Sequence, residues 1–491
     1  LNQASIYPET ARQWFLNIID WLKEWPCARK SGLGTPLPWS PGWIVETLTD
    51  STVYMAFYTI NKHLKQYNIK GEQLTPEVFD YIFYGKGNPK KISEQSKIDS
   101  KILDEMRSEF LYWYPVDLRI SAKELLPNHL TFFLFQHAAL FPDHLPQGIG
   151  VNGMLSIEGK KMSKSKGNFV TLKDALNQFG ADATRCALLL GGEGMNDPDW
   201  RRETVGDVKS KLHGFLSLTD SIIENAKETK TGHLEEWLIS MLQHRIKTVT
   251  ENMESLKTRT AIENALFEVW NDFRWYIRRK EKFDSKVLKA ALETWTRLLA
   301  PFAPYICEEI WSKLKKSGFI SLADWPVYDE KKVNVQAEET ENLIKNVLED
   351  SSNILRATKM VPKEIHYYSA ASWKWKVYLT ALKKSISANV VLSDLMNELM
   401  KDSDLKKMAG KVAKFARGIT EEINRMPEDR KLRQLQIGAV DETTLLGQAE
   451  AFFGREFNAK IHTYREDDQR LHDPQKKAGL ARPYRPAIYI G

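Results

Sequence analysis

The chain has 491 residues with a formal net charge of +6, and 42% of its residues are hydrophobic. This composition excludes a largely disordered chain and suffices for several domains with separate cores, and the small positive excess is compatible with a nucleic-acid partner. Its three cysteines, Cys27, Cys186 and Cys307, lie far apart, and no apolar run reaches the length of about 18 residues that suggests a membrane span. The sequence therefore predicts no disulfide framework, no zinc or other metal site and no membrane partner, and it favours the reducing cytoplasm.

The N-terminal part of the chain alternates between helical and strand patterns. Apolar residues at helical spacing predict a helix over 9–25, and Thr75 followed by Pro76 predicts the start of a helix over 75–84. Further helices are expected over 97–112, 129–141 and 172–178, and strands over 116–121 and 149–156. Strands that alternate with helices indicate α/β architecture with a parallel sheet.

A dense lysine cluster lies at residues 159–167. Four lysines fall within seven positions between Gly159 and Gly167. Such a cluster repels itself unless a multiply charged anion lies among the ammonium groups, and the glycines give the backbone freedom to move onto that anion. The segment therefore predicts a phosphate-binding loop, with a solvated lysine-rich turn as the alternative.

Residues 203–316 show only helical periodicity. Helices joined by short polar links predict an antiparallel bundle, and Pro301 and Pro304 should kink its last helix. The expected helices cover 203–227, 234–254, 259–280 and 286–316.

The composition changes again beyond residue 330. A strand is expected over 364–368, and two more strands, over 459–465 and 486–490, could pair with it. Helices are expected over 337–358, 371–385, 391–400, 403–424 and 441–453. This pattern predicts a small α+β domain.

The string Lys161-Met162-Ser163-Lys164-Ser165 resembles the KMSKS signature of class I aminoacyl-tRNA synthetases, and segments 21–38, 180–190 and 300–311 resemble other parts of these enzymes in the same order. The resemblance implies a multidomain α/β plus α protein. It assigns residues 1–202 to the second half of a Rossmann-like catalytic domain, 203–330 to an antiparallel helical anticodon-binding bundle, and 331–491 to a C-terminal α+β tRNA-binding domain.

Two segments resemble leucyl-tRNA synthetases of the archaeal and eukaryotic type. Residues 48–60 are similar to their leucine-pocket segment, and residues 114–132 to their adenosine and side-chain segment. The bacterial pattern has a second His directly after the Glu, where this chain has Leu125, so a role of that His cannot be transferred.

The resemblance implies an amino-acid site at Asp50, Ser51, Tyr54 and His129, and a ribose contact at Glu124. Each has a structural alternative: Asp50 as a helix cap, Ser51 and Tyr54 as core residues, His129 as a buried core histidine, and Glu124 as a solvated cap.

The family activity is ATP-dependent activation of leucine to leucyl-adenylate, followed by transfer to the 3′-terminal ribose of tRNA-Leu. The resemblance therefore implies ATP as substrate, Mg²⁺ with it, and leucine and tRNA-Leu as partners. Lys161 and Lys164 would be the catalytic residues that stabilise the departing pyrophosphate. The ATP-binding residues would be Lys161, Met162, Ser163, Lys164, Ser165 and Glu124.

Basic and aromatic residues near the C-terminus suit contacts with phosphates and bases. In the archaeal and eukaryotic branch, the resemblance assigns this domain to the long variable arm of the tRNA. The expected tRNA-binding residues are Tyr464, Arg465, Arg482, Tyr484 and Arg485.

Class I synthetases also need a His-Ile-Gly-His-type motif, and no such tetrapeptide occurs in the chain, whose first residue is Leu. We therefore expect the C-terminal half of a leucyl-tRNA synthetase that lacks the first phosphate motif and the editing domain, with the missing N-terminal half, in cis or as a separate chain, as a partner. The alternatives are a catalytically inert tRNA-binding module, or an isoleucyl, valyl or methionyl relative.

Overall fold

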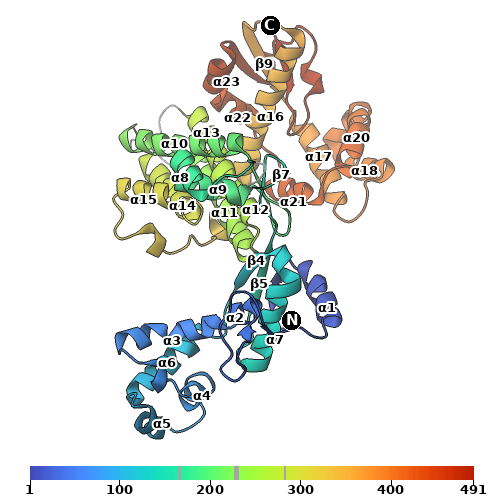
Figure 1. Cartoon of the computed structure of the whole chain (residues 1–491). Coiled ribbons are helices and arrows are strands. Elements are labelled where there is room, and N and C mark those ends of the chain that lie inside the picture. The colour runs from blue at the N-terminus through green and yellow to red at the C-terminus, as the bar shows by residue number, and fades with distance from the viewer. Residues whose placement is uncertain (164–166, 226–231, 281–283) are drawn as a thin grey trace. The chain divides into compact units, whose positions relative to one another are not determined.

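The computed structural model describes residues 1–163, 167–225, 232–280 and 284–491 (Figure 1). The chain divides into two compact units. The first comprises Leu1–Gly214, Thr248–Leu266 and Leu299–Glu309, and the second comprises Phe215–Lys247, Phe267–Leu298 and Ile310–Gly491. Because these units interleave along the sequence, they do not test the division at residues 202 and 330, which stays a prediction.

A three-stranded parallel sheet forms the centre of the first unit. Its strand order is β1 (Ser5–Tyr7), β5 (Gly148–Asn152) and β4 (Arg119–Ala122), so the last strand in sequence lies in the middle. Ile149 and Val151 of β5 are buried with apolar residues from α1 (Ala11–Trp21) and α7 (Thr131–Leu140) or the turn before it. This confirms the α/β architecture expected from the strand and helix patterns.

Helices of the first unit form a lobe (Figure 1), and its hydrophobic core combines aliphatic side chains with a group of aromatic rings. Phe110 stacks on Tyr114 with a centroid distance of 4.6 Å, and Phe141 packs against both rings. The lobe comprises α3 (Tyr54–Gln66), α4 (Pro76–Tyr84), α5 (Pro89–Ser96) and α6 (Ser100–Trp113). Pro76 occupies the first position of α4 as expected, and Gly85 ends this helix in the left-handed conformation.

Shorter elements complete the first unit. A small sheet has the order β7 (Lys160–Lys161), β6 (Ser156–Ile157) and β8 (Asp199–Trp200), and β2 (Ala28–Arg29) pairs with β3 (Ile44–Val45). The short helices of this unit include α2 (Thr47–Ser51), α8 (Leu172–Phe179), α9 (Ala181–Leu190) and α12 (Thr258–Ile262).

The long helices expected between 203 and 316 are present, with two interruptions. A π-helical turn at Glu263–Glu268 divides the helix expected over 259–280, and the helix expected over 286–316 breaks before Pro304 rather than only kinking. The Asp182 carboxylate accepts hydrogen bonds from the first free backbone N–H groups of the new helix, at Tyr305 (3.2 Å) and Ile306 (2.7 Å). The helices are α10 (Arg202–Asn225), α11 (His233–Glu254), α13 (Val269–Arg279), α14 (Ser285–Leu299) and α15 (Pro304–Lys313).

The second unit contains the sheet expected from the three C-terminal strand patterns. Its order is β10 (Lys460–Arg465), β9 (Glu364–Ser369) and β11 (Ala487–Ile490), with β10 parallel and β11 antiparallel to β9. The prediction that the two later strands pair with the first is confirmed.

One face of this sheet packs on three helices through buried apolar residues. The helices are α16 (Val335–Thr358), α22 (Glu442–Gln448) and α23 (Glu450–Phe457). A second core is formed mainly by α17 (Ser372–Lys384), α18 (Leu392–Leu399), α19 (Ser403–Lys407) and α20 (Ala409–Asn424). The chain also forms α21 (Glu428–Ile437), a helix not expected from the sequence.

Across the described ranges, every helix falls short of the length or the apolar character needed to cross a membrane.

Candidate functional site

We call residues 159–167 the lysine loop. The loop begins in the tight hairpin turn that joins β6 to β7. Glu158 and Gly159 both have positive φ angles, +50° and +74°, as a two-residue hairpin turn requires. The Asp199 carboxylate accepts hydrogen bonds from the Gly159 N–H and the Ser156 hydroxyl, each at 2.8 Å. The Gly159 hydrogen bond and the nearby Arg201 guanidinium hold the pKa of Asp199 below its usual value. The base of the loop is therefore fixed by one ionised carboxylate.

Asn168 joins the two stems of the lysine loop. Its Nδ2 donates to the carbonyl oxygen of Lys161 at 2.8 Å, and its Oδ1 accepts from the backbone N–H of Ser163 at 3.1 Å. The Lys161 side chain is exposed, and Met162 and Ser163 are half-buried. Lys164 and Ser165, also expected in the ATP site, lie outside the described residues.

The segments that follow β4 and β5 both contact Asp197, which lies just before β8. Lys123 Nζ lies 2.6 Å from Asp197 Oδ1, which also accepts from the Met154 backbone N–H at 2.7 Å. Gly153 is required at this crossing, because a Cβ there would lie 2.1 Å from the Asn196 carbonyl oxygen. Glu124, the expected ribose contact, is exposed directly after β4. It thus lies at the edge of a parallel sheet where ligands of α/β folds bind.

His129 connects two segments that the sequence assigned to the amino-acid site. It lies in a π-helical turn, Leu126–Leu130, that precedes α7, a geometry frequent at functional sites. His129 Nδ1 lies 3.2 Å from Ser51 Oγ, and Nε2 lies 2.9 Å from Arg119 Nη2. Burial and the Arg119 charge lower the pKa of His129, so its imidazole is neutral at pH 7. A neutral ring that accepts from Arg119 carries its proton on Nδ1 and can donate it to Ser51.

The structure argues against two of the structural alternatives for the amino-acid candidates, the helix cap at Asp50 and the core position of Tyr54. Asp50 lies within α2, and the N-cap position of the following helix α3 is Val53, so Asp50 does not cap that helix. Its carboxylate accepts from the Thr35 hydroxyl at 3.4 Å. Tyr54 begins α3, is 41% exposed, and packs edge-on against Tyr58 rather than in a core.

A cleft of about 800 Å³ opens beside β1 and β5 in the first unit. Its walls come from residues 2–10, Arg12, 150–152, 193–196 and 255–257. None of the residues expected in the ATP or amino-acid sites lines it within the part of the chain that the structure describes.

The candidate tRNA contacts of the second unit differ in exposure. Arg485 is exposed, whereas Arg482 pairs with Glu422 at 3.1 Å and Arg465 pairs with Asp467. Tyr464 is half-buried on the sheet, with its ring stacked 5.9 Å from that of His366.

Tyr484 was expected to stack on bases, and this expectation is wrong. The side chain is only 8% exposed, and its ring packs against Trp375 at 5.1 Å. Its backbone, at φ +61°, directs the N–H to the buried Glu442 carboxylate, 2.6 Å away. The tight turn between Arg482 and Arg485 turns this tyrosine into the core while the arginines face outward.

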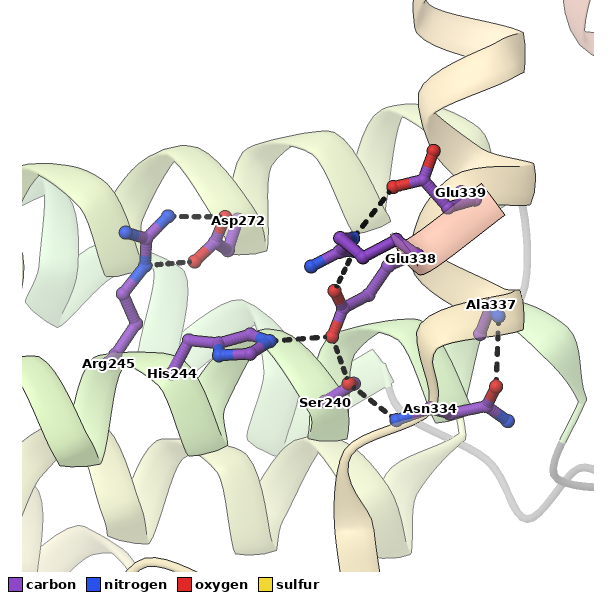
Figure 2. Close-up of polar contacts among 9 residues, drawn as sticks. Ser240, His244, Arg245, Asp272, Asn334, Ala337, Glu338 and Glu339 are labelled. Carbon is purple, nitrogen blue, oxygen red and sulfur yellow. Dashed lines mark hydrogen bonds and ion pairs between the residues drawn. The ribbon is translucent and has the colours of Figure 1, made fainter. Parts of the chain in front are cut away.

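A buried ionic cluster in the second unit was not expected from the sequence (Figure 2). Glu338 of α16 accepts hydrogen bonds from Ser240 Oγ and His244 Nε2 of α11 and from Arg433 of α21. Burial raises the pKa of Glu338, but these donors outweigh burial and bring it down to about 2. Its partners are about 95 residues away in sequence, so no local pattern could reveal the cluster.

Comparisons with known proteins agree with the synthetase resemblance. Residues 101–215 match the family described as tRNA synthetases class I (M), and residues 235–367 match the anticodon-binding domain of tRNA ligase. Over its entire length the chain is 40% identical to the leucine–tRNA ligase of Pyrococcus abyssi and 40% identical to that of Methanococcoides burtonii. The whole chain is therefore similar in sequence to a part of the leucine–tRNA ligases.

The chain spans about half the length of these relatives, 50% and 51% respectively. Among solved structures, the ternary complex of LeuRS, tRNA and LeuAMS from Agrobacterium radiobacter K84 aligns with a TM-score of 0.41 and 24% identity, covering 52% of this chain and 33% of the other.

Proposed function

We propose that this chain contributes the lysine loop, part of the leucine pocket and the tRNA-binding surfaces of an archaeal or eukaryotic-type leucine–tRNA ligase. The observation that carries the proposal is the 40% identity to leucine–tRNA ligases over the whole chain. The family matches at 101–215 and 235–367 support a division between catalytic and anticodon-binding parts.

The proposed chemistry begins with ATP bound by the lysine loop. The carboxylate of leucine attacks the α-phosphorus, the bond to the bridging oxygen breaks, and pyrophosphate leaves with leucyl-adenylate as the other product. Lys161 and Lys164 stabilise the charge on the leaving pyrophosphate, and Asn168 and Asp199 hold the base of the loop. Ser163 and Ser165 contribute hydroxyls, and Met162 shapes the loop between its lysines.

Glu124, exposed after the carboxyl end of β4, would accept hydrogen bonds from the ribose hydroxyls. Asp50, Ser51, Tyr54 and His129 form the proposed amino-acid side, where the neutral His129 ring aligns the Ser51 hydroxyl. Mg²⁺ would bind to the phosphates of ATP and spread their charge.

Transfer follows when the ribose hydroxyl of the tRNA 3′ end attacks the acyl carbon and AMP leaves. The proposed tRNA contacts are Tyr464, Arg465, Arg482 and Arg485, with Tyr484 supporting the turn that carries the last two arginines.

The lysine loop is tested by Lys164→Ala in a full-length leucine–tRNA ligase that carries these 491 residues. Loss of a preorganised charge should slow leucine-dependent ATP–pyrophosphate exchange by roughly 10²-fold, with little change in leucine affinity. Lys173→Ala, an exposed lysine on α8, is the matched control. A normal exchange rate in the Lys164 variant would remove the catalytic assignment.

The 491 residues alone are expected to show only background exchange, because the chain contains no His-Ile-Gly-His-type motif. That absence also motivates the competing hypothesis of an inert tRNA-binding module. The two differ in the full-length protein, where the ligase hypothesis requires exchange that depends on Lys164 and the inert module requires tRNA binding without exchange.

A further inference from the structure

The face of the β10-β9-β11 sheet opposite α16 carries a group of imidazole rings. Side chains alternate along a strand, so Glu364 and His366 of β9 lie on one face, while Ile365 and Tyr367 point into the core on the other. His462 is the direct partner of His366 on β10, and the two rings stack at 4.8 Å. His472, on the segment that connects β10 to β11, adds a third ring 5.1 Å from that of His366.

His366 is the central residue of this group, and its ring nitrogens lack hydrogen-bond partners among the residues that the structure describes. The side chain is only 3% exposed, yet neither ring nitrogen makes a hydrogen bond among the described residues. Its Nε2 lies 3.4 Å from Glu364 Oε1 without the alignment of a hydrogen bond. A buried polar group without a partner costs about 1–3 kcal/mol, so such groups usually have a ligand to satisfy them.

We propose that Glu364, His366 and His472 bind a divalent transition metal of the Zn²⁺ class, with His462 as the fourth ligand. The ligand atoms of the first three residues all lie within 4.8 Å of one another. The second Glu364 oxygen, Oε2, lies 3.8 Å from His462 Nε2. The set contains imidazole and carboxylate ligands, as zinc sites do.

The distances fit a tetrahedral ion after small side-chain movements. Bond lengths of about 2.0–2.2 Å to nitrogen or oxygen place neighbouring ligand atoms about 3.3 Å apart. The Glu364–His366 separation of 3.4 Å already meets this value. His472 is exposed and can rotate toward the ion.

The metal would fasten the connecting segment between β10 and β11 to the sheet. That segment, residues 466–486, has little regular structure, and the Tyr368 hydroxyl already holds it by donating to the His472 carbonyl oxygen at 2.6 Å. The same segment contains Arg482 and Arg485, so the ion would help to hold the turn that presents these arginines. This inference does not rest on the proposed ligase activity.

The test is calorimetric titration of the untagged, EDTA-treated chain with Zn²⁺. We expect one ion per chain, and a melting temperature that rises with the Zn²⁺ concentration. Glu364→Gln and His472→Gln should each weaken binding at least about 100-fold, since even outer-sphere partners of metal ligands contribute 10–100-fold. His213→Gln, an exposed histidine in the first unit, is the matched control and should bind normally.

Co²⁺ provides a second measurement. Four-coordinate Co²⁺ absorbs visible light strongly, so the unmodified chain should show this spectrum and both ligand variants should lose it while keeping the circular dichroism of the folded protein. Saturable Zn²⁺ binding that survives in both variants, or no binding by the unmodified chain, would overturn the proposal.

Discussion

Single side chains set the geometry of the lysine loop, and the most informative of them is Asn168. The lysines themselves were evident from the sequence, because five residues in a fixed order between two glycines form a distinctive pattern. Asn168 was not, because an asparagine after a glycine is compatible with any turn. Only the two hydrogen bonds to Lys161 and Ser163 reveal that it closes the loop at its base.

Asn168→Ala should therefore impair ATP use in the full-length ligase. Two lost hydrogen bonds of about 1 kcal/mol each predict a roughly 10–30-fold lower kcat/KM for ATP, with the KM for leucine almost unchanged. Pyrophosphate exchange at varied ATP and varied leucine separates the two effects. Asn177→Ala, an exposed asparagine on α8, serves as control. An equal loss for both substrates would mean that Asn168 supports the fold rather than the loop.

At the scale of helices and strands, the spacing of apolar residues predicted the elements that have one buried face. The strands over 364–368, 459–465 and 486–490 were expected from alternation, and β9, β10 and β11 match them closely. Helix α21 was missed because its sequence, EDRKLRQLQI, has few apolar residues; its buried positions are Lys431 and Gln434. Tyr484 was misjudged because a sequence with arginines on either side does not show which way a tight turn points its tyrosine.

The Glu338 cluster links α11, α16 and α21 and should make the second unit sensitive to acid. The pKa of Glu338 is lowered in the folded state, so its stabilisation is present above the unfolded value near 4.5 and is lost as the pH falls toward about 2. Glu338→Gln should lower the free energy of unfolding by about 3 kcal/mol at pH 7 and by much less at pH 3.

Urea unfolding at both pH values measures this difference. Glu349→Gln, an exposed carboxylate on the same helix, should have almost no effect at either pH. If Glu338→Gln lowers the free energy of unfolding by the same amount at pH 3 as at pH 7, packing and not the ionised carboxylate accounts for the stabilisation.

At the scale of the whole molecule, α16 contacts both the helices α11 and α13 and the C-terminal sheet of the second unit. Its Glu341 accepts from Trp275 Nε1 (2.8 Å) and Arg279 Nε (2.6 Å) of α13, while Leu343 and Val347 pack in the core beneath the C-terminal sheet. Removing the chain from Asn334 onward would leave the donors of α11 and α13 without their buried carboxylates. The proposed role of the C-terminal region in tRNA binding is therefore better tested by substitution of surface charges than by truncation.

Arg485→Glu in the full-length ligase should weaken tRNA binding more than Arg482→Glu does. Arg485 is exposed and makes no ion pair within the described ranges, so its charge is available to a phosphate, whereas Arg482 already pairs with Glu422. Loss of one phosphate contact should reduce the slope of log affinity against log salt concentration by about 1. Filter binding at several salt concentrations measures this slope, with Arg417→Glu, an exposed arginine on α20, as control.

A comparison of two tRNAs tests whether this turn contacts a long variable arm. If it does, Arg485→Glu should weaken binding of a tRNA with that arm more than binding of a tRNA without it. Equal losses for both would assign Arg485 to general phosphate attraction.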